Sequence, residues 1–201
     1  MGGTIAQLLA IHHPKRVLTI TSLMSSPDLS IKNDAFSGKD TSKAKLPPPQ
    51  TDFIAAVLAL NKTEPKTKQE KIQQIVGNWR LANGGKALFN EEYWFRITEE
   101  AMTREEANPE AKNLKFANHG NHSKAQMATS EPNLSTLKLI KVPTLVIHGS
   151  EDPIFLPKHA EAIAELVPKA KLLLIEGMGH ALNPSYFKEI TGAIIEHIQQ
   201  S

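Results

Sequence analysis

The sequence predicts an α/β fold, a short parallel sheet flanked by helices, and two observations support this prediction. Three short apolar runs are expected to be strands, at residues 17–24, 142–148 and 171–176, and the first of them is β-branched and lacks helical spacing, as a buried strand does. Amphipathic helices are expected next to them in the chain, at residues 2–13, 157–166 and from 183 onward. Because strands and helices alternate, we expect parallel strands with helices on both faces of the sheet.

The ends of these helices follow from the local sequence. The first helix is expected to end at His13, because the residue before Pro14 avoids helical backbone angles. In the last helix, Asn183 is expected to be the cap and Pro184 the first residue. Its buried face is expected to consist of Phe187, Ile190, Ile194 and Ile198.

Residues 27–137 interrupt this alternation and are expected to form a helical cap or lid inserted into the sheet domain. The core of that domain would then consist of residues 1–26 and 138–201. Residues 27–50 carry no periodic pattern and are expected to be loop. Helices are expected at 53–60, 66–81 and 91–102.

Most aromatic residues fall in this insertion, at positions Phe36, Phe53, Trp79, Phe89, Tyr93, Trp94, Phe95 and Phe116. They form either an apolar wall over a substrate pocket or the core of the cap itself.

Composition narrows the classes of function. The chain has 40% hydrophobic and 22% charged residues and no apolar run long enough to span a bilayer, so no membrane partner is expected. The net charge is only +2 and the lysines are scattered, which argues against nucleic acid and favours a small-molecule partner. Because the chain has no cysteine and no secretory signal pattern, a cytoplasmic location is the default expectation.

Two polar residues follow strands of the predicted sheet. Asp152 comes after the strand at 142–148, and His180 comes after the strand at 171–176. Ligands of open parallel sheets bind at the carboxyl ends of the strands, where both residues would lie. A carboxylate that orients an imidazole is the support system of a nucleophilic hydrolase. Taken alone, Asp152 in its Glu-Asp-Pro sequence is also a common turn former.

Three segments resemble the α/β-hydrolase family in the order that the family has them. Residues 143–153 look like its triad-acid segment, and residues 177–180 look like its triad-histidine segment. Residues 1–7, followed by His13 and Pro14, resemble the sequence just after the nucleophile in the family's G-x-S-M-G-G turn. The stretch at 46–49 is similar to a bacterial branch that includes aclacinomycin methylesterase-like proteins.

This resemblance implies the C-terminal part of an α/β-hydrolase fold and a carboxylic-ester hydrolase with a Ser-Asp-His triad. Asp152 would orient His180, and a small apolar ester would be the substrate, with no cofactor and no metal. The nucleophile would stand immediately before Met1, and the residue at the Met1 position would donate an oxyanion N–H. We therefore expect the 201-residue chain to be truncated and inactive alone; an aspartate nucleophile or C–C bond hydrolysis stays open.

Other residues invite competing interpretations. Ser22, Ser25 and Ser150 lie on or after other strands and are poor substitutes for the nucleophile. His119 and His122 have a spacing that metal sites use, but no thiolate or helical carboxylate accompanies them. We expect a polar loop there and no metal site.

A second hypothesis is a non-catalytic remnant or interaction module. In the resembling family, the strand at 17–24 has a neighbour from a preceding segment, so an apolar sheet edge would be exposed here. Such an edge predicts self-association into a homo-oligomer, or pairing with an N-terminal fragment.

Overall fold

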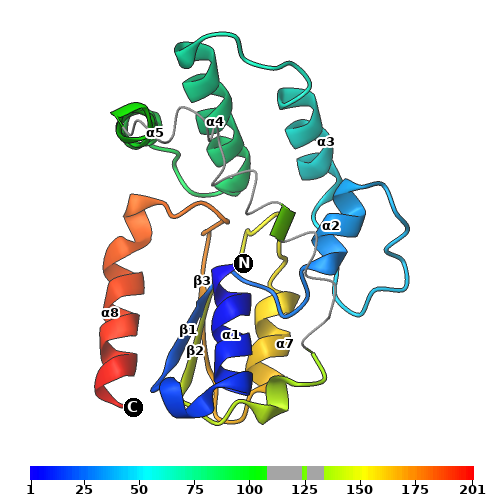
Figure 1. Ribbon diagram of the computed structural model, residues 1–201, viewed down its shortest axis with the longest axis vertical. Helices are drawn as coiled ribbons and strands as arrows, with labels where there is room; N and C mark the ends of the chain where they lie inside the picture. Colours follow the sequence, from blue (N-terminus) through cyan, green and yellow to red (C-terminus); the bar gives the residue numbers. More distant parts are fainter. Residues whose placement is uncertain (108–123, 126–133) are drawn as a thin grey trace.

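The computed structural model describes residues 1–107, 124–125 and 134–201 (Figure 1). The described residues form a three-stranded sheet in the order β1 (Ile20–Leu23), β2 (Thr144–Gly149), β3 (Lys171–Ile175). Both strand pairs are parallel, with Ile20 opposite Thr144 and Leu145 opposite Lys171. The predicted α/β class and parallel sheet are confirmed.

Helices precede and follow the strands as the alternation predicted. They are α1 (Gly2–His12), α2 (Ser30–Phe36), α3 (Thr51–Leu60), α4 (Lys68–Ala82), α5 (Glu91–Ala107), α7 (Lys158–Leu166) and α8 (Phe187–Gln199). Short 3-10 turns lie at η1 (Pro14–Arg16), η3 (Leu137–Leu139) and η4 (Pro184–Tyr186). No helix in the described ranges is both long and apolar enough to cross a membrane.

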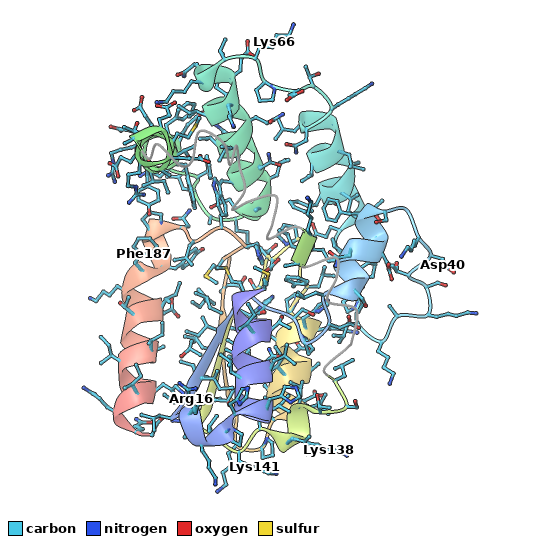
Figure 2. The ribbon with its side chains drawn as sticks, in the orientation of Figure 1. Arg16, Asp40, Lys66, Lys138, Lys141 and Phe187 are labelled. Atoms are coloured by element: carbon cyan, nitrogen blue, oxygen red, sulfur yellow. The ribbon has the colours of Figure 1, made fainter. Side chains whose placement is uncertain are left out.

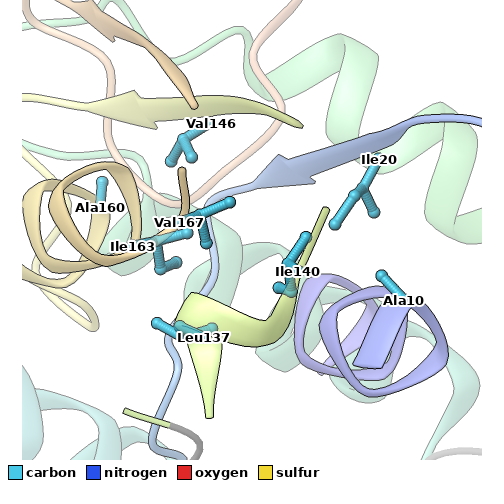
Figure 3. Close-up of a cluster of buried hydrophobic side chains, with 8 residues drawn as sticks. All are labelled: Ala10, Ile20, Leu137, Ile140, Val146, Ala160, Ile163 and Val167. Carbon is cyan, nitrogen blue, oxygen red and sulfur yellow. The ribbon is translucent and has the colours of Figure 1, made fainter. Parts of the chain in front are cut away.

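Two helix layers cover β1 and β2, whereas β3 is largely exposed, including Leu172 and Leu174. On one face, α1 and α7 pack on Val146 and Ile20 through Ala10 and Ile163, as Figure 3 shows. On the other face, Ile190 of α8 packs against alternate residues of β2 and against the end of β3. All six residues of β2 are buried, as expected for the central strand of a sheet covered on both sides.

The first strand is shorter than predicted. It begins at Ile20 rather than at residue 17, because η1 follows α1 and Val17 still closes that turn by donating its N–H to Pro14 O. Leu18, which was predicted to lie in the strand because it is apolar, is 88% exposed and lies before it. The last helix also differs: Asn183 caps η4 through Ser185 N, and α8 starts only at Phe187.

The helices α2, α3, α4 and α5 lie between β1 and β2 in sequence, and we call residues 27–107 the helical segment. Figure 1 shows α3, α4 and α5 beyond the carboxyl ends of the strands. The prediction of loop throughout 27–50 is wrong, because α2 occupies Ser30–Phe36. Asp28 Oδ1 accepts hydrogen bonds from N and Oγ of Ser30, the first residue of α2, and Ile31 is buried, so these contacts support a helix that is too short to show a period.

Aromatic rings of the helical segment contact one another. Trp94 is buried and stacks on Trp79 at 4.7 Å between ring centroids, with the Tyr93 ring 5.5 Å away. Trp94 also clusters with Ile72 and Val76 of α4. These contacts form a hydrophobic core that the segment shares with the sheet domain, since Ala181 is buried in the same cluster and the Phe187 ring lies 6.3 Å from that of Tyr93; Phe116 lies outside the described residues.

Charged side chains are spread over the surface. Figure 2 shows Arg16, Lys138 and Lys141 at the end of the core farthest from the helical segment, and Lys66 at the opposite end of the molecule. These labelled cations therefore do not form one continuous basic stripe.

Candidate active site

Asp152 and His180 lie in loops that leave neighbouring parallel strands at the same edge of the sheet. Asp152 follows β2, and His180 follows β3. Backbone hydrogen bonds join the two loops: Ser150 N donates to Ile175 O at 3.0 Å, and Glu151 N donates to Met178 O at 2.9 Å. The strand register and these bonds hold the two side chains within reach of each other.

The two side chains are joined by a hydrogen bond. Nδ1 of His180 lies 2.7 Å from Oδ2 of Asp152. The Asp152 side chain is fully buried, whereas 23% of the His180 side chain is exposed. Because an ionised carboxylate can only accept, Nδ1 carries the proton and Nε2 presents its lone pair. Nε2 has no hydrogen-bond partner within the part of the chain that the structure describes, so it is available to take a proton.

The other carboxylate oxygen of Asp152 binds its own turn. Oδ1 accepts hydrogen bonds from Ile154 N at 2.8 Å and from Phe155 N at 2.9 Å. Asp152 thus forms the turn, as its Glu-Asp-Pro sequence suggests, and orients the imidazole with the remaining oxygen. One side chain satisfies both interpretations of the sequence.

His148 supports the turn from the end of β2. Its Nε2 lies 2.6 Å from Phe155 O and 3.4 Å from Asp152 Oδ2. Burial lowers the pKa of His148, while the nearby Asp152 carboxylate opposes this shift, and the ring is therefore neutral near pH 7. A carbonyl oxygen only accepts, so the proton of the neutral ring is on Nε2.

Gly149 allows the two loops to meet. A Cβ at this position would overlap the backbone carbonyl group of Met178, which is held in the loop after β3. That loop opens at Gly177 with a φ of +75°, a backbone conformation that glycine adopts without strain. These two glycines fix the backbone path between the acid and the histidine.

The serines considered as substitutes for the nucleophile do not bond His180. Ser22 Oγ accepts from Gln7 Nε2, Ser25 lies beside Thr4, and Ser150 Oγ accepts from Gly177 N.

The sequence analysis missed a buried serine–histidine pair elsewhere in the core. Oγ of Ser26 lies 2.8 Å from Nδ1 of His159. Nε2 of the same ring lies 2.8 Å from Pro47 O in the helical segment. Because Ser26 and His159 are both buried, a substrate cannot reach the hydroxyl, and we interpret the pair as structural.

Met1 lies at the amino end of α1, where its carbonyl accepts a bond from Ile5 N at 3.0 Å. Figure 1 shows this end of α1 at the same edge of the sheet as the loops after β2 and β3. Gly3 packs closely against Ser25, because a Cβ added at position 3 would lie 2.6 Å from Cβ of Ser25. Packing of α1 on the end of β1 therefore requires this glycine.

Metal ligands are not gathered in the described ranges: no group of three or more histidine, aspartate or glutamate side chains there has the geometry to hold an ion. His119 and His122, the pair considered for a metal, lie outside the residues that the structure describes.

Comparison with known proteins gives the family. A model of the alpha/beta hydrolase fold family matches residues 1–184. Rhodomycin D methylesterase DauP of Streptomyces sp. (strain C5) is 29% identical over 98% of this chain, and DnrP of Streptomyces peucetius is 28% identical over 98%. The chain spans 64% of the length of each of these two relatives.

A solved structure shares the fold at lower identity. The meta-cleavage product hydrolase CumD from Pseudomonas fluorescens IP01 superposes with a TM-score of 0.60 and 15% identity, over 98% of this chain and 61% of that one. The family match, the related methylesterases and the shared fold agree: the chain belongs to the α/β-hydrolase fold family.

Proposed function

We propose that this chain carries the acid and the base of a carboxylic-ester hydrolase. The observation that supports the proposal most strongly is the hydrogen bond of 2.7 Å between buried Asp152 and partly exposed His180. A buried carboxylate holds the imidazole in the tautomer whose Nε2 accepts a proton, and exposure of the imidazole leaves that atom accessible.

In the proposed reaction, Nε2 of His180 takes the proton of a nucleophilic hydroxyl as its oxygen bonds to the ester carbonyl carbon. Asp152 stabilises the imidazolium that forms. The imidazolium then returns the proton to the departing alcohol oxygen as the C–O bond breaks, leaving an acyl-enzyme. Water, deprotonated by the same Nε2, attacks the acyl group, and the released hydroxyl recovers its proton.

The nucleophile in this proposal comes from outside the 201 residues. No hydrogen bond joins Ser22, Ser25 or Ser150 to His180. The family resemblance puts the nucleophile immediately before the Met1 position, and the residue at that position would donate an oxyanion N–H. We therefore expect the chain alone to be inactive.

For the substrate, we propose a small apolar ester that reacts without a cofactor. The two curated relatives are methylesterases by name, which supports ester over C–C bond hydrolysis. We further propose that residues 27–137 act as a cap over a core formed by 1–26 and 138–201, and that the protein works in the cytoplasm. Helices α3, α4 and α5 beyond the carboxyl ends of the strands are consistent with a cap (Figure 1).

The test uses the chain joined to the part of DauP that it leaves unmatched, which we call the joined form. We expect the joined form to hydrolyse aromatic methyl esters, and H180Q to lower kcat by roughly 10²–10⁴-fold, as expected for loss of a general base. The exposed His12→Gln is the matched control and leaves kcat unchanged. Hydrolysis by the joined form that H180Q does not reduce would contradict the proposed role of His180.

A second candidate function is strand-mediated association, and the outer edge of β1 favours it. β1 is at the end of the sheet and pairs only with β2 among the described strands. Ile20 N donates to Pro143 O and Met24 N to Ile147 O, so the intervening Thr21 directs its backbone groups away from β2. Leu18, two residues before β1, is an exposed apolar side chain close to this edge in sequence.

We propose that this edge pairs with a strand of an N-terminal fragment or, without one, with a second copy. We expect sedimentation velocity to show a dimer, weakened by Thr21→Pro, which removes an outward N–H. A monomer at high concentration would count against self-association.

A further inference from the structure

The end of α4 contacts the loop that carries His180, and we call residues 177–183 the histidine loop. The carbonyl oxygen of Ala82, the last residue of α4, accepts hydrogen bonds from His180 N at 2.7 Å and from Ala181 N at 3.1 Å. The backbone of His180 is therefore held by a helix that precedes it by about a hundred residues, in addition to the sheet domain from which the loop emerges.

Two asparagine side chains extend this contact. Nδ2 of Asn183 donates to Oδ1 of Asn83 at 2.9 Å and to Leu88 O at 2.8 Å. Nδ2 of Asn83 donates to Ala87 O at 2.8 Å. Both side chains belong to buried residues, which are 2% exposed at Asn83 and 1% exposed at Asn183. Removal of either amide would leave buried polar atoms without a partner.

The other atom of the Asn183 amide has a separate task. Its Oδ1 accepts hydrogen bonds from Ser185 N at 3.0 Å and from Ser185 Oγ at 2.6 Å, which caps η4. The oxygen of Asn183 thus ends the histidine loop, while its nitrogen ties that loop to the helical segment. A substitution can separate these two tasks.

Backbone atoms approach closely at the same contact. A Cβ at Gly179 would overlap the carbonyl group of Asn83, and Gly84, with φ of +83°, would bring a Cβ within 3.0 Å of Gly179 Cα. At the rim, Nζ of Lys86 lies 3.0 Å from a carboxylate oxygen of Glu151 and 3.0 Å from one of Glu176. The contact is therefore packed and hydrogen-bonded, with little room for the loop to shift independently of α4.

We propose that Asn83 and Asn183 are positioning residues that hold His180 in register with Asp152. The proposal rests on the proposed function, in which Nε2 of His180 is the general base. In this proposal the helical segment positions a catalytic group, because the amide pair and Ala82 O hold the loop that carries the His180 imidazole. Loosening the amide pair should displace the imidazole even though neither asparagine touches it.

The informative variants are Asn83→Ala and Asn183→Ser. A serine at position 183 keeps an oxygen that can cap Ser185 N but removes the two donors to Asn83 and Leu88. The control is Asn61→Ala, since Asn61 and Asn78 form an exposed amide–amide contact, with Nδ2 of Asn61 at 2.8 Å from Oδ1 of Asn78. That control pair joins α3 to α4 and lies away from the histidine loop.

Two readouts in the 201-residue chain do not depend on activity. The Nδ1 proton of His180 should give a downfield NMR signal that weakens or moves in N83A and N183S but not in N61A. Amide hydrogen exchange at His180 and Ala181, whose N–H groups bond Ala82 O, should be about tenfold faster in the first two variants. If one variant fails to fold, the other decides the matter.

A third readout uses the joined form. There N83A and N183S should lower kcat about tenfold with KM within about twofold, because misplacing a catalytic group affects the reaction more than binding. Wild-type signal and exchange rates in both variants would overturn the proposal, as would a rise in KM at unchanged kcat. Failure of the proposed function would instead leave the joined form without H180Q-sensitive activity, whatever the signal and exchange rates show.

Discussion

His148 contacts both Asp152 and Phe155, the two ends of the turn that carries the acid. Its Nε2 lies 2.6 Å from the carbonyl oxygen of Phe155 and 3.4 Å from Oδ2 of Asp152, so one buried imidazole contacts both ends of the turn. Since the pKa of His148 is lowered by burial, this support comes from a neutral ring that donates a hydrogen bond.

Replacing His148 by leucine should therefore destabilise the protein by about 1–3 kcal/mol, because a buried carbonyl oxygen loses its donor. H148Q retains a side-chain N–H donor and should recover part of this loss. Urea unfolding monitored by circular dichroism measures both effects. The exposed His12→Leu is the control, expected to stay within about 0.5 kcal/mol of the wild type. Equal stability of H148L and the wild type would show that the bond to Phe155 contributes nothing.

Stability should fall in mild acid because of two buried histidines. Burial lowers the pKa of both His148 and His159 below the ordinary value of 6.5, against the opposing effect of Asp152 on each ring. Below pH 6.5 the unfolded chain takes up a proton at each imidazole and the folded protein does not. The free energy of unfolding should then drop by up to about 1.4 kcal/mol per pH unit for each histidine, until the lowered pKa is passed.

The measurement is a series of urea titrations between pH 8 and pH 5 on the wild type and on H159Q. The glutamine cannot take up the proton, so the slope of stability against pH should be shallower in H159Q below pH 6.5. His12→Gln, which changes an exposed histidine, is the control. A wild-type curve that rises as the pH falls below 6.5 is incompatible with neutral, buried rings at 148 and 159.

Two glycines should respond to alanine in opposite directions. A Cβ at Gly149 would overlap the Met178 carbonyl group, so G149A should cost about 1–3 kcal/mol through overpacking. Gly192 lies in α8 with open space around it, so G192A should stabilise the protein by up to about 1 kcal/mol through helix propensity. Thermal unfolding of the two variants side by side provides the test, and a tolerated G149A would mean that the two loops are free to separate.

The sheet and the location of the site were predictable because they depend on local patterns. Short apolar runs marked β2 and β3, and the rule for parallel strands put Asp152 and His180 at one edge, where the structure has Nδ1 of His180 2.7 Å from Oδ2 of Asp152. Their catalytic role stays a prediction. The start of β1 was misjudged since Leu18 is apolar yet exposed, and tertiary packing rather than composition decides where pairing begins.

Other features depend on contacts between distant residues, which composition does not encode. The sequence predicts Asn183 as a helix cap. It does not predict that the Asn183 amide also donates to Asn83, because that partner lies a hundred positions earlier in the chain. The pair of Ser26 and His159 likewise joins residues 133 positions apart. One local signal was available: Asp28 followed by Ser30 is a helix-start pattern that indicates α2.

The proposed roles of Asp152 and His180 are tested most directly by labelling with a fluorophosphonate, a probe that bonds covalently to an activated nucleophilic serine, followed by mass spectrometry. We expect no labelling of the 201-residue chain and stoichiometric labelling of the joined form at a serine of the added part, abolished by H180Q and retained in H12Q. Stoichiometric labelling of Ser22, Ser25, Ser150 or any other serine of the 201-residue chain would contradict this expectation, as would labelling of the joined form that H180Q leaves unchanged.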